Sequence, residues 1–482
     1  MDLRIKKHPL LDFTEKRQRK VKFYFDGKEF EGYESEPIAV ALYANNVKKL
    51  STSAILGRPR GLFCAIGKCA SCRVVVNGIP NVRACQEPVR EGIRIMSSQG
   101  LEKLEVVEEF PPKMKTPETI ETEILVIGSG PAGAMAALKA ADLGAKVLLV
   151  DYTSKIGGQL VKQTHKFFGW SKYFAGTRGT KIAKILEEEI KKRENIEVWL
   201  ESPVVGYYEE GVFAVLKNKK KIVFVKPKRT IIAPGAVERF AVFENNDLPG
   251  IMGAGGAQTL MNVWGVKPGN KVLVVGSGNV GLIVSYQMAQ AGIKVVAIVE
   301  ALPSIGGYFV HAAKVRRLGI PILTKHTIIK AEGEDSVKKA IIAEINEKWE
   351  VIPGTEKEFD VDAVIVAVGM YPDTALTQMI GAKHVFVKEL GGFVPLRTKY
   401  LETSVKGVYI AGDVSCIEEA STALMEGIIA GISAAFSLGY EDEDAKRELR
   451  EVFKDLDEFR AGPRYIRIKD ALKKVIINSE GV

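Results

Sequence analysis

The chain has 482 residues, of which 46% are hydrophobic and 26% charged, and its net charge at pH 7 is +9. These proportions are ordinary for a soluble globular protein of about three domains. No apolar run approaches the roughly 18 residues of a membrane span, and residues 1–7 lack the apolar stretch of a signal peptide.

Basic residues are interspersed with acidic ones, which argues against a nucleic-acid partner. A basic surface would instead suit anionic nucleotides or an acidic partner subunit. The densest basic runs are short. We expect residues 17–20 to form a solvent-exposed arm and residues 217–221 to form a hairpin tip.

Four of the five cysteines lie between residues 64 and 85, which indicates a metal site and not a secreted disulfide framework. We therefore expect a cytoplasmic protein.

The first part of the chain predicts a small, β-rich domain. Residues 21–25 and 28–33 alternate as strands around an Asp26-Gly27 turn. A short helix is expected at 38–46, and a loop rich in glycine, arginine and proline follows at 57–61. Further strands are expected at 74–76 and 93–96. Pro111, Pro112 and Pro117 mark a linker, so this domain is expected to end at residue 112.

The cysteines follow the spacing Cys64-x4-Cys69-x2-Cys72-x12-Cys85. Three cysteines with x4 and x2 spacing and a distant fourth are typical of plant-type [2Fe–2S] ferredoxins. Four thiolates must converge on two irons, and small residues such as Gly67 keep the loop compact and let backbone N–H groups point at sulfur. A zinc site, the alternative, prefers two C-x2-C pairs. We therefore predict that these four cysteines hold a [2Fe–2S] cluster.

Beyond the linker the pattern becomes strand, helix and strand, expected at 123–127, 131–143 and 147–150. In the turn after such a strand, the first glycine permits the bend, the second lets the backbone approach a pyrophosphate, and the third lets helix and strand pack closely. The helix N-terminus attracts phosphates, and Asp151 at the end of the second strand can accept a hydrogen bond from a ribose hydroxyl. The motif reads Gly128-Ser129-Gly130-Pro131-Ala132-Gly133. It predicts an adenine-dinucleotide site.

The same arrangement returns at 271–275, 280–291 and 295–299, with Gly276, Gly278 and Gly281 in the turn and Glu300 at the position of Asp151. An acid there repels a 2′-phosphate and favours NAD over NADP. The two copies also share a segment after the acid, namely Ile156-Gly157-Gly158-Gln159 and Ile305-Gly306-Gly307. An internal duplication of about 150 residues is too long for a solenoid and predicts two dinucleotide-binding domains. The alternative is a second copy that is kept only for its fold.

A late segment, Gly412-Asp413, follows an expected strand and precedes a helix expected at 420–435. Such a segment can aim a carboxylate at a flavin's ribityl chain, and the helix can direct its positive N-terminus at the flavin. The segments Ala233-Pro234-Gly235 and Gly369-x-x-Pro372 make this pattern more specific. Because the late segment has no place in the second dinucleotide domain, we expect that domain to be inserted into the first. A charged helix with one apolar face is expected at 441–460.

Together, these motifs show a resemblance to known families. Residues 119–439 resemble the flavoproteins with two dinucleotide-binding domains, the glutathione-reductase-like superfamily, and the N-terminal part resembles the ferredoxin-like domain of sarcosine oxidase alpha subunits. A narrower group comprises the alpha subunits of dye-linked L-proline dehydrogenase, sarcosine oxidase and opine oxidase, and a hydrogen cyanide synthase subunit. The chain resembles this group, the archaeal L-proline dehydrogenase members most, at 58–64 (RPRGLFC), 82–86 (VRACQ), 233–240 (APGAVERF) and 246–252 (NDLPGIM).

The resemblance implies an α/β protein with two Rossmann-like domains. The expected parts are a β-grasp [2Fe–2S] domain at 1–112, an FAD or adenine-nucleotide domain split between 119–240 and 360–440, an NAD-binding-like domain at 241–359, and a helical tail at 441–482. The expected cofactor-binding residues are the two glycine motifs and Asp413, together with Gly158, Gln159, Ala233 and Gly235. No catalytic residue is assigned.

The resemblance also implies a function. Within this group the first site can hold plain ATP or ADP instead of FAD, and an FMN can lie at a subunit junction. We expect an electron-transferring subunit of a hetero-oligomeric dehydrogenase. Its FAD-containing beta subunit would oxidise L-proline or a related secondary amine, and a small ferredoxin-like subunit is a further candidate partner. The alternatives are a stand-alone NADH:acceptor oxidoreductase using FAD and the cluster, and a scaffold that binds only ADP or ATP.

The chain departs from the family pattern in its cysteines. Disulfide reductases carry a redox-active cysteine pair beside the flavin, whereas residues 156–161 (IGGQLV) contain none and the only C-x2-C belongs to the cluster motif. We therefore reject disulfide reduction. No cysteine follows Cys416, so a cysteine-rich C-terminal module seen in several relatives is expected to be absent or a separate protein. Cys416 is expected to be a core residue, and His165 and His311 receive no catalytic role.

Overall fold

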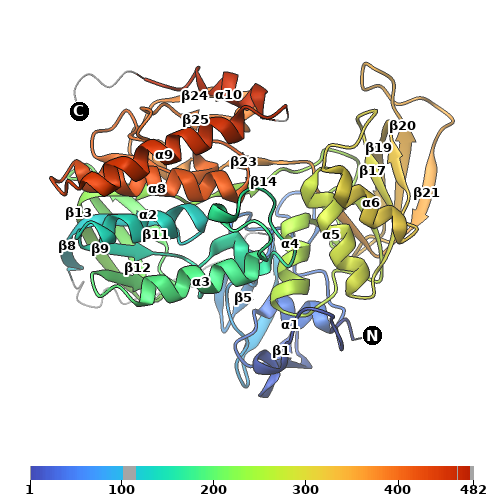
Figure 1. Ribbon diagram of the computed structural model, residues 1–482. Helices are drawn as coiled ribbons and strands as arrows, with labels where there is room; N and C mark the ends of the chain where they lie inside the picture. The colour runs from blue at the N-terminus through green and yellow to red at the C-terminus, as the bar shows by residue number, and fades with distance from the viewer. Residues whose placement is uncertain (1, 101–115, 464, 478–482) are drawn as a thin grey trace. The chain divides into compact units, whose positions relative to one another are not determined.

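The computed structural model describes residues 2–100, 116–463 and 465–477 (Figure 1). The chain divides into two compact units. Unit 1 comprises Met1–Phe110 and Glu238–Gly369, and unit 2 comprises Pro111–Val237 and Met370–Val482. The second segment of unit 1 thus interrupts unit 2 in the sequence. The finer division of unit 1 into a cluster domain and an NAD-type domain stays a prediction.

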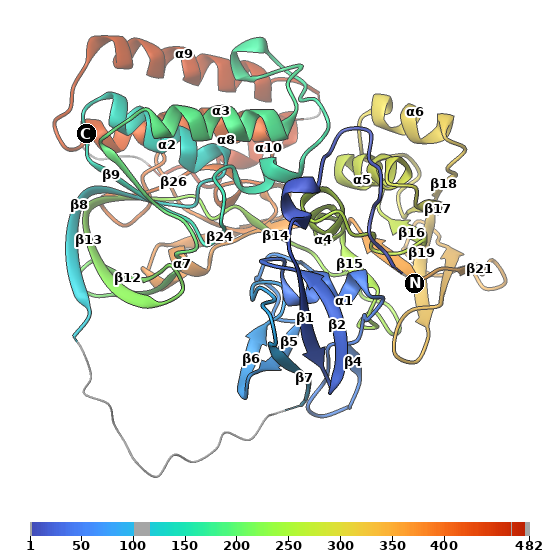
Figure 2. The ribbon, with the colours of Figure 1, turned by 90° about the horizontal axis from the view of Figure 1, so that it is seen from below.

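The N-terminal part of unit 1 is a mixed sheet with one helix, shown in Figure 2. Its strands are β1 (Lys20–Phe25), β2 (Lys28–Tyr33), β3 (Ser51–Thr52), β4 (Pro59–Arg60), β5 (Arg73–Val76), β6 (Ile79–Arg83) and β7 (Arg94–Gln99), with the helix α1 (Ile38–Ala44) after β2. The strand order is β2-β1-β7-β3-β4, and β5 pairs with both β6 and β7. Asp26 and Gly27 have positive φ angles of 48° and 77°, as a two-residue hairpin turn requires. The expected strands and helix are confirmed, and β3, β4 and β6 are additions, of which β4 lies within the expected loop.

The expectation of a solvent-exposed arm at residues 17–20 is wrong for Arg17. Leu3 and Ile5 are buried in the core of unit 1, and the chain returns to them through the 3₁₀ turn η1 (Thr14–Arg17). The Arg17 guanidinium donates to the carbonyl oxygens of Ile5 and Gly265, each at 2.9 Å. The guanidinium therefore satisfies buried backbone acceptors, a role that a run of basic letters does not reveal.

The second part of unit 1 is a parallel sheet of order β15-β22-β16-β17-β18. Its elements are β15 (Ile251–Gly253), α4 (Ala254–Gln258), the π-helical turn η4 (Thr259–Val263), β16 (Lys271–Val275), α5 (Asn279–Gln290), β17 (Lys294–Glu300), α6 (Phe309–Arg317), β18 (Ile322–Thr324) and β22 (Ala363–Val366). An antiparallel meander is formed by β19 (His326–Glu332), β20 (Lys339–Glu344) and β21 (Lys357–Asp360). Because β22 lies between β15 and β16, the boundary falls at 369/370 and not at the expected 359/360.

The two parts of unit 1 share one hydrophobic core. Phe23 and Leu42 from the first part belong to the same buried cluster as Met252 and Leu260 from the second. Polar contacts join the parts as well, because Arg58 binds the Asp247 carboxylate through two nitrogens, at 2.6 and 2.8 Å, and Arg60 binds it too. The cysteine-bearing part is therefore packed directly on the second dinucleotide fold.

Unit 2 is built on a sheet of order β10-β9-β8-β13-β12-β11, with β26 paired to β13. Its strands are β8 (Glu118–Ile127), β9 (Val147–Val150), β10 (Ile196–Trp199), β11 (Val204–Tyr208), β12 (Val212–Lys217), β13 (Lys221–Ile232) and β26 (Val408–Ile410). Its helices include α2 (Pro131–Asp142), α3 (Gly179–Lys191), α8 (Ala420–Phe436) and α9 (Glu443–Arg460). Helix α8 lies between α2 and α9 (Figure 1). The hairpin tip expected at 217–221 is confirmed as the turn between β12 and β13.

Smaller elements complete the fold. They are β14 (Ala236–Glu238), β23 (Met370–Pro372), α7 (Ala375–Met379), β24 (His384–Val387), β25 (Gly392–Pro395) and α10 (Ile466–Leu472). The expected charged helix is confirmed as α9, whose Leu449, Val452 and Leu456 are buried. Across the described residues, every helix is too short or too polar to span a membrane.

Candidate nucleotide and cluster sites

The first glycine motif forms the turn between β8 and α2, and its three glycines differ in their surroundings. Gly128 has φ of 102°, and a Cβ there would lie 2.2 Å from the Ala233 carbonyl oxygen. A Cβ at Gly133 would lie 1.8 Å from the carbonyl oxygen of Gly128. Gly130, with φ of −64°, has nothing within 4 Å of such an atom. Gly128 and Gly133 therefore serve the packing of the chain, and Gly130 borders open space that a pyrophosphate can fill.

The second motif, between β16 and α5, repeats this geometry. A Cβ at Gly276 would lie 2.3 Å from the Ala367 carbonyl oxygen, and one at Gly281 would lie 2.0 Å from that of Gly276. Gly278, with φ of −65°, again faces open space. Both loops therefore have the backbone cradle that a dinucleotide requires.

The duplicated segment after each acid closes over its glycine loop. The Gly157 N–H donates to the Ser129 carbonyl at 2.9 Å, and the Gly307 N–H donates to the Ser277 carbonyl at 2.9 Å. A Cβ at Gly158 would lie 2.8 Å from Gly130 Cα, so Gly158 lies at the edge of the open space. Gln159 is exposed beside it.

The two acids are bound within the chain. Asp151 accepts four hydrogen bonds, from the backbone and hydroxyl of Ser129 at 2.6 and 2.7 Å and from those of Thr153 at 2.7 Å each. Glu300 accepts three, two from Ser277 and one from the Leu302 N–H. A carboxylate offers about four acceptor positions. A ribose hydroxyl can therefore bind Glu300 directly, whereas at Asp151 it must replace a donor of the chain.

The late segment lies against the first glycine loop. A Cβ at Gly412, which has φ of 78°, would lie 2.9 Å from Ala132 Cβ, and one at Gly427 in α8 would lie 2.2 Å from the Ala132 carbonyl oxygen. Asp413 is thereby placed beside the loop. Burial raises the pKa of Asp413 to about 7; nearby Glu418 and Glu426 also raise it, and a backbone N–H of Glu418 opposes them. Ala233 is brought to the same loop through Gly128, and Gly235 has open space around it.

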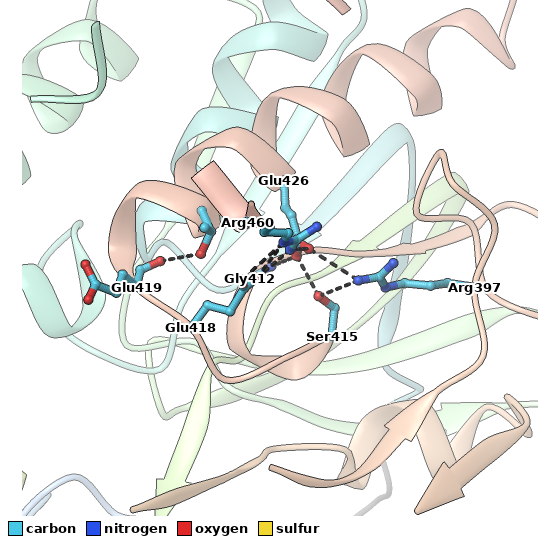
Figure 3. Close-up of polar contacts among 8 residues, drawn as sticks. Arg397, Gly412, Ser415, Glu418, Glu419, Glu426 and Arg460 are labelled. Carbon is cyan, nitrogen blue, oxygen red and sulfur yellow. Dashed lines mark hydrogen bonds and ion pairs between the residues drawn. The ribbon is translucent and has the colours of Figure 1, made fainter. Parts of the chain in front are cut away.

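A buried ionic cluster, which sequence reasoning missed, lies under this segment (Figure 3). Glu426 accepts from the Gly412 N–H at 3.0 Å and the Ser415 hydroxyl at 2.5 Å, and it pairs with Arg460 at 2.8 Å and Arg397 at 3.3 Å. Arg460 also binds Glu418. Burial opposes ionisation of Glu426, but the two arginines hold its pKa below its usual value. The one available signal was Glu426 itself, an acid inside the otherwise apolar α8.

The four motif cysteines meet as two pairs. The Cys64 and Cys69 thiols are hydrogen-bonded to each other, and so are those of Cys72 and Cys85. Among the described residues, no group of three or more His, Cys, Asp or Glu side chains forms a single-ion site. Two thiolates for each of two irons is the arrangement that a [2Fe–2S] cluster needs, so the donor set fits that group.

The cysteine loop directs backbone N–H groups at sulfur. The Cys69 N–H donates to Cys64 Sγ at 3.4 Å. The hydrogen bond from the Cys69 thiol, with backbone donors from Ile66, Cys69 and Lys68, lowers the pKa of Cys64 to about 5. Ala65, Gly67 and Ala70 all have positive φ angles, which glycine adopts freely and alanine only at a cost in energy. The loop therefore stabilises negative charge on Cys64 Sγ, whereas the hydrogen bond to Cys64 and burial raise the pKa of Cys69.

The cysteine loop packs against helix α4. A Cβ at Gly256 would lie 2.2 Å from the carbonyl oxygen of Phe63, the residue before Cys64, and the Phe63 ring stacks on Phe240 with centroids 4.4 Å apart. Cys416 lies apart from this loop in the sequence and belongs to a small hydrophobic cluster of unit 2, as expected for a core residue.

Comparison with known families agrees with this geometry. A model described as pyridine nucleotide-disulphide oxidoreductase matches residues 122–427, and a model described as 2Fe-2S iron-sulfur cluster binding domain matches residues 18–100. The fold class expected from the sequence is thus confirmed.

The relatives include subunits of oxidases and a solved dehydrogenase. The alpha subunit of sarcosine oxidase from Corynebacterium sp. (strain P-1) is 27% identical over 439 residues, which cover 86% of this chain and 43% of the relative. An opine oxidase subunit of Rhizobium meliloti is 28% identical over 66% of this chain and 71% of its own. The crystal structure of L-proline dehydrogenase from P. horikoshii is similar with a TM-score of 0.68, 28% identity, and 92% and 79% coverage. The chain spans less than half the length of the sarcosine oxidase relative.

Proposed function

Because the chain belongs to the pyridine nucleotide-disulphide oxidoreductase family and contains a 2Fe-2S cluster binding domain, we propose that it is the electron-transferring subunit of an amine- or amino-acid-oxidising dehydrogenase. In this proposal an FAD-containing partner subunit oxidises L-proline or a related secondary amine. One observation carries it. The four motif cysteines pair two by two at the predicted cluster site, and Cys416 lies in an apolar cluster. Among the described residues, no further cysteine pair is therefore left for disulfide chemistry.

The residues of the chain supply binding and orientation. The open side of Gly130 admits a pyrophosphate at the N-terminus of α2, and Asp413 offers a carboxyl group to a ribityl chain beside that loop. A bound flavin would convert a hydride into two single electrons, which an iron–sulfur cluster can carry one at a time. The backbone donors around Cys64 favour the more negative state of such a cluster.

The nucleotide at the first site is part of the proposal. Gly130 contacts only the ADP half of a ligand, so the loop accepts FAD, ATP or ADP equally. We propose FAD because Asp413 lies beside the loop. The ribityl chain of FAD could bind the Asp413 carboxyl group, whereas an adenine nucleotide has no ribityl chain. An FMN at a junction with the partner subunit would be an additional group.

A second candidate function is NADH oxidation by the chain itself. Gly278 has the same open side as Gly130, and Glu300 keeps an acceptor position for a ribose hydroxyl. A 2′-phosphate beside this carboxylate would be repelled, so NADH is preferred over NADPH.

Two alanine variants test both assignments. Gly130→Ala and Gly278→Ala place a methyl group in open space at φ angles that alanine adopts readily, so both variants should fold normally. The purified full-length chain is assayed anaerobically for iron, acid-labile sulfide, heat-released nucleotide and visible spectrum, before and after NADH. Circular dichroism verifies folding.

We expect two irons per chain in all three proteins, FAD released from the native chain and from Gly278→Ala, and little from Gly130→Ala. Bleaching of the flavin band by NADH in the native chain, lost in Gly278→Ala, would establish the second function. Release of ATP or ADP instead of FAD would contradict the flavin assignment, and folded protein without iron would contradict the electron-transfer role.

A further inference from the structure

The sheet that carries the cysteines bears charge in two different ways. On the hairpin of β1 and β2, both lysines of β1 are matched by an acid on β2: Lys20 pairs with Glu31 at 2.9 Å and Lys22 with Glu29 at 2.8 Å. These are ordinary cross-strand pairs that stabilise a sheet.

The other half of the sheet lacks such matching. Strands β5, β6 and β7 contain Arg73, Arg83 and Arg94 and no acidic residue. Arg73 and Arg83 are direct cross-strand partners, both exposed, and like charges in this position destabilise a sheet. Among the described residues, none of the three arginines forms an ion pair. Arg73 only donates to Asn81 Oδ1 at 3.2 Å. Because the pairing of Arg73 with Arg83 lowers the stability of the sheet, a binding role for these arginines would explain it better than a structural one.

Apolar side chains lie among these arginines. Met96 pairs with Val75 across β5 and β7 and is 53% exposed, and Ile79 at the start of β6 is 65% exposed. On β7, Met96 shares the period-two face of Arg94, and its partner Val75 shares the face of Arg73 and Arg83. Ile79 pairs with Val76 beyond the register shift and does not belong to this face. An apolar centre with a charged rim is the composition of a protein-docking surface. We name this surface the arginine face: Arg73, Arg83, Arg94 and Met96. Figure 2 shows β5 and β6 beside β7, the strand between β1 and β3.

The arginine face lies next to the cysteines. Arg73 directly follows Cys72, and Arg83 precedes Cys85 by two residues. These two cysteines form one of the thiol pairs. A partner that binds across Arg73 and Arg83 is therefore brought to the half of the cluster site that Cys72 and Cys85 form.

We propose that the arginine face is the docking surface for a small, acidic, one-electron carrier protein, which accepts electrons from this chain. The proposal rests on the proposed function, because it needs the chain to carry a reduced cluster. One electron passes to the carrier, which is reduced by one, and the chain is left oxidised by one; no bond forms or breaks. Acidic side chains of the carrier would relieve the repulsion between Arg73 and Arg83. Charge of this kind mainly accelerates encounter and makes it sensitive to salt.

The test uses the full chain and two pairs of charge reversals on the same sheet. Arg73→Glu/Arg83→Glu alters the arginine face, and Lys20→Glu/Lys22→Glu is the matched control on β1. Binding to an acidic [2Fe–2S] ferredoxin is measured by titration calorimetry at low and at 0.5 M salt. Stopped-flow spectroscopy then follows electron transfer from the dithionite-reduced chain to that ferredoxin, to a basic c-type cytochrome, and to a small uncharged quinone.

We expect the arginine reversal to weaken ferredoxin binding and slow its reduction by about tenfold or more at low salt, and to make both nearly independent of salt. The lysine control should change them less than about twofold, and reduction of the quinone should be unchanged in both variants. Ferredoxin binding at native strength by the arginine variant would overturn the proposal, and so would preferential binding of the basic cytochrome by the native chain.

Two further outcomes are separable. Arginine-dependent binding without electron transfer would support the docking surface and contradict the electron-transfer role. Residues 101–115, outside the described structure, contain Glu102, Glu105, Glu108 and Glu109. If the native chain bound the ferredoxin only after these four were changed to glutamine, the arginine face would belong to the chain's own acidic segment, and the proposal would fail.

Discussion

The hydroxyl of Ser129 donates a hydrogen bond to Asp151 at 2.7 Å, and Ser277 repeats this contact with Glu300 at 2.6 Å. In each copy the backbone N–H of the serine donates to the same carboxylate oxygen. Both serines are fully buried. The acid at the end of the second strand therefore ties down the glycine loop, so that the open side of Gly130 or Gly278 is shaped by the chain itself.

Ser129→Ala and Ser277→Ala should each lower the free energy of unfolding by about 1–3 kcal/mol, because each removes a buried hydrogen bond to a charged acceptor. The effects should be separate, since Ser129 lies in unit 2 and Ser277 in unit 1. Differential scanning calorimetry and limited proteolysis identify which unit is weakened. Equal thermal midpoints for the native chain and both variants would show that the hydroxyl groups of Ser129 and Ser277 do not contribute to stability.

Gly133→Ala should be far more harmful than Gly130→Ala, although both lie in one loop. The added methyl at Gly133 would meet the Gly128 carbonyl oxygen at 1.8 Å, whereas that at Gly130 meets nothing within 4 Å. Overpacking of this kind costs about 1–3 kcal/mol or more. Soluble yield and thermal midpoint measure the difference. Similar stability of the two variants would contradict the packing role assigned to Gly133.

The glycine loops and the cysteine loop could be predicted because their geometry is encoded in short stretches. Gly128 needs a positive φ and Gly133 a missing side chain, and both demands fall within six residues of each other in the sequence. The cysteine spacing likewise sets the pairing of thiols through one tight loop and the turn that follows β6. Local motifs of this kind survive changes elsewhere in the chain.

The buried ionic cluster and the role of Arg17 could not be predicted, because their partners are distant in sequence. Arg397, Glu426 and Arg460 come from a loop and two helices, and Arg17 binds a carbonyl of Gly265. No local pattern specifies which of many arginines becomes buried. The boundary at 369/370 was missed for a similar reason: β22 belongs to its sheet through pairing with β15 and β16, which precede it by about a hundred residues.

Asp413 should make stability depend on pH. Its pKa is raised from the ordinary 3.8 to about 7, so the folded chain holds this proton more tightly than the unfolded chain does. The resulting stabilisation is complete below pH 3.8 and is lost as the pH rises to about 7, with a slope of at most about 1.4 kcal/mol per pH unit. Asp413→Asn has no such loss.

The thermal midpoints of the native chain and Asp413→Asn, measured from pH 4 to pH 8, test this sign. The variant should gain relative to the native chain as the pH rises towards 7, and the difference should then level off. A difference that does not change with pH would mean that Asp413 titrates normally. A bound first-site ligand that donates a hydrogen bond to the carboxylate should shift the window to lower pH.

Glu426 should be a positioning residue for the first site as well as a structural one. It is fully buried between Arg397 and Arg460, and its Oε2 atom holds the Gly412 N–H and the Ser415 hydroxyl on either side of Asp413. Removing one partner of a buried ion pair costs about 3–5 kcal/mol, because the remaining charge is uncompensated. We expect Glu426→Gln to lower the melting midpoint of unit 2 and to loosen the Gly412-Asp413 turn.

The double variant Arg397→Met/Glu426→Gln separates the two roles. Because it removes a positive and a negative charge together, it should recover part of the stability that Glu426→Gln loses. It should not recover first-site ligand retention, since the carboxylate that holds Gly412 and Ser415 is still missing. Retention is measured as nucleotide remaining after gel filtration, below the melting midpoint of each protein. If retention returned together with stability, Glu426 would act through stability alone, and its hydrogen bonds to the turn would not position Asp413.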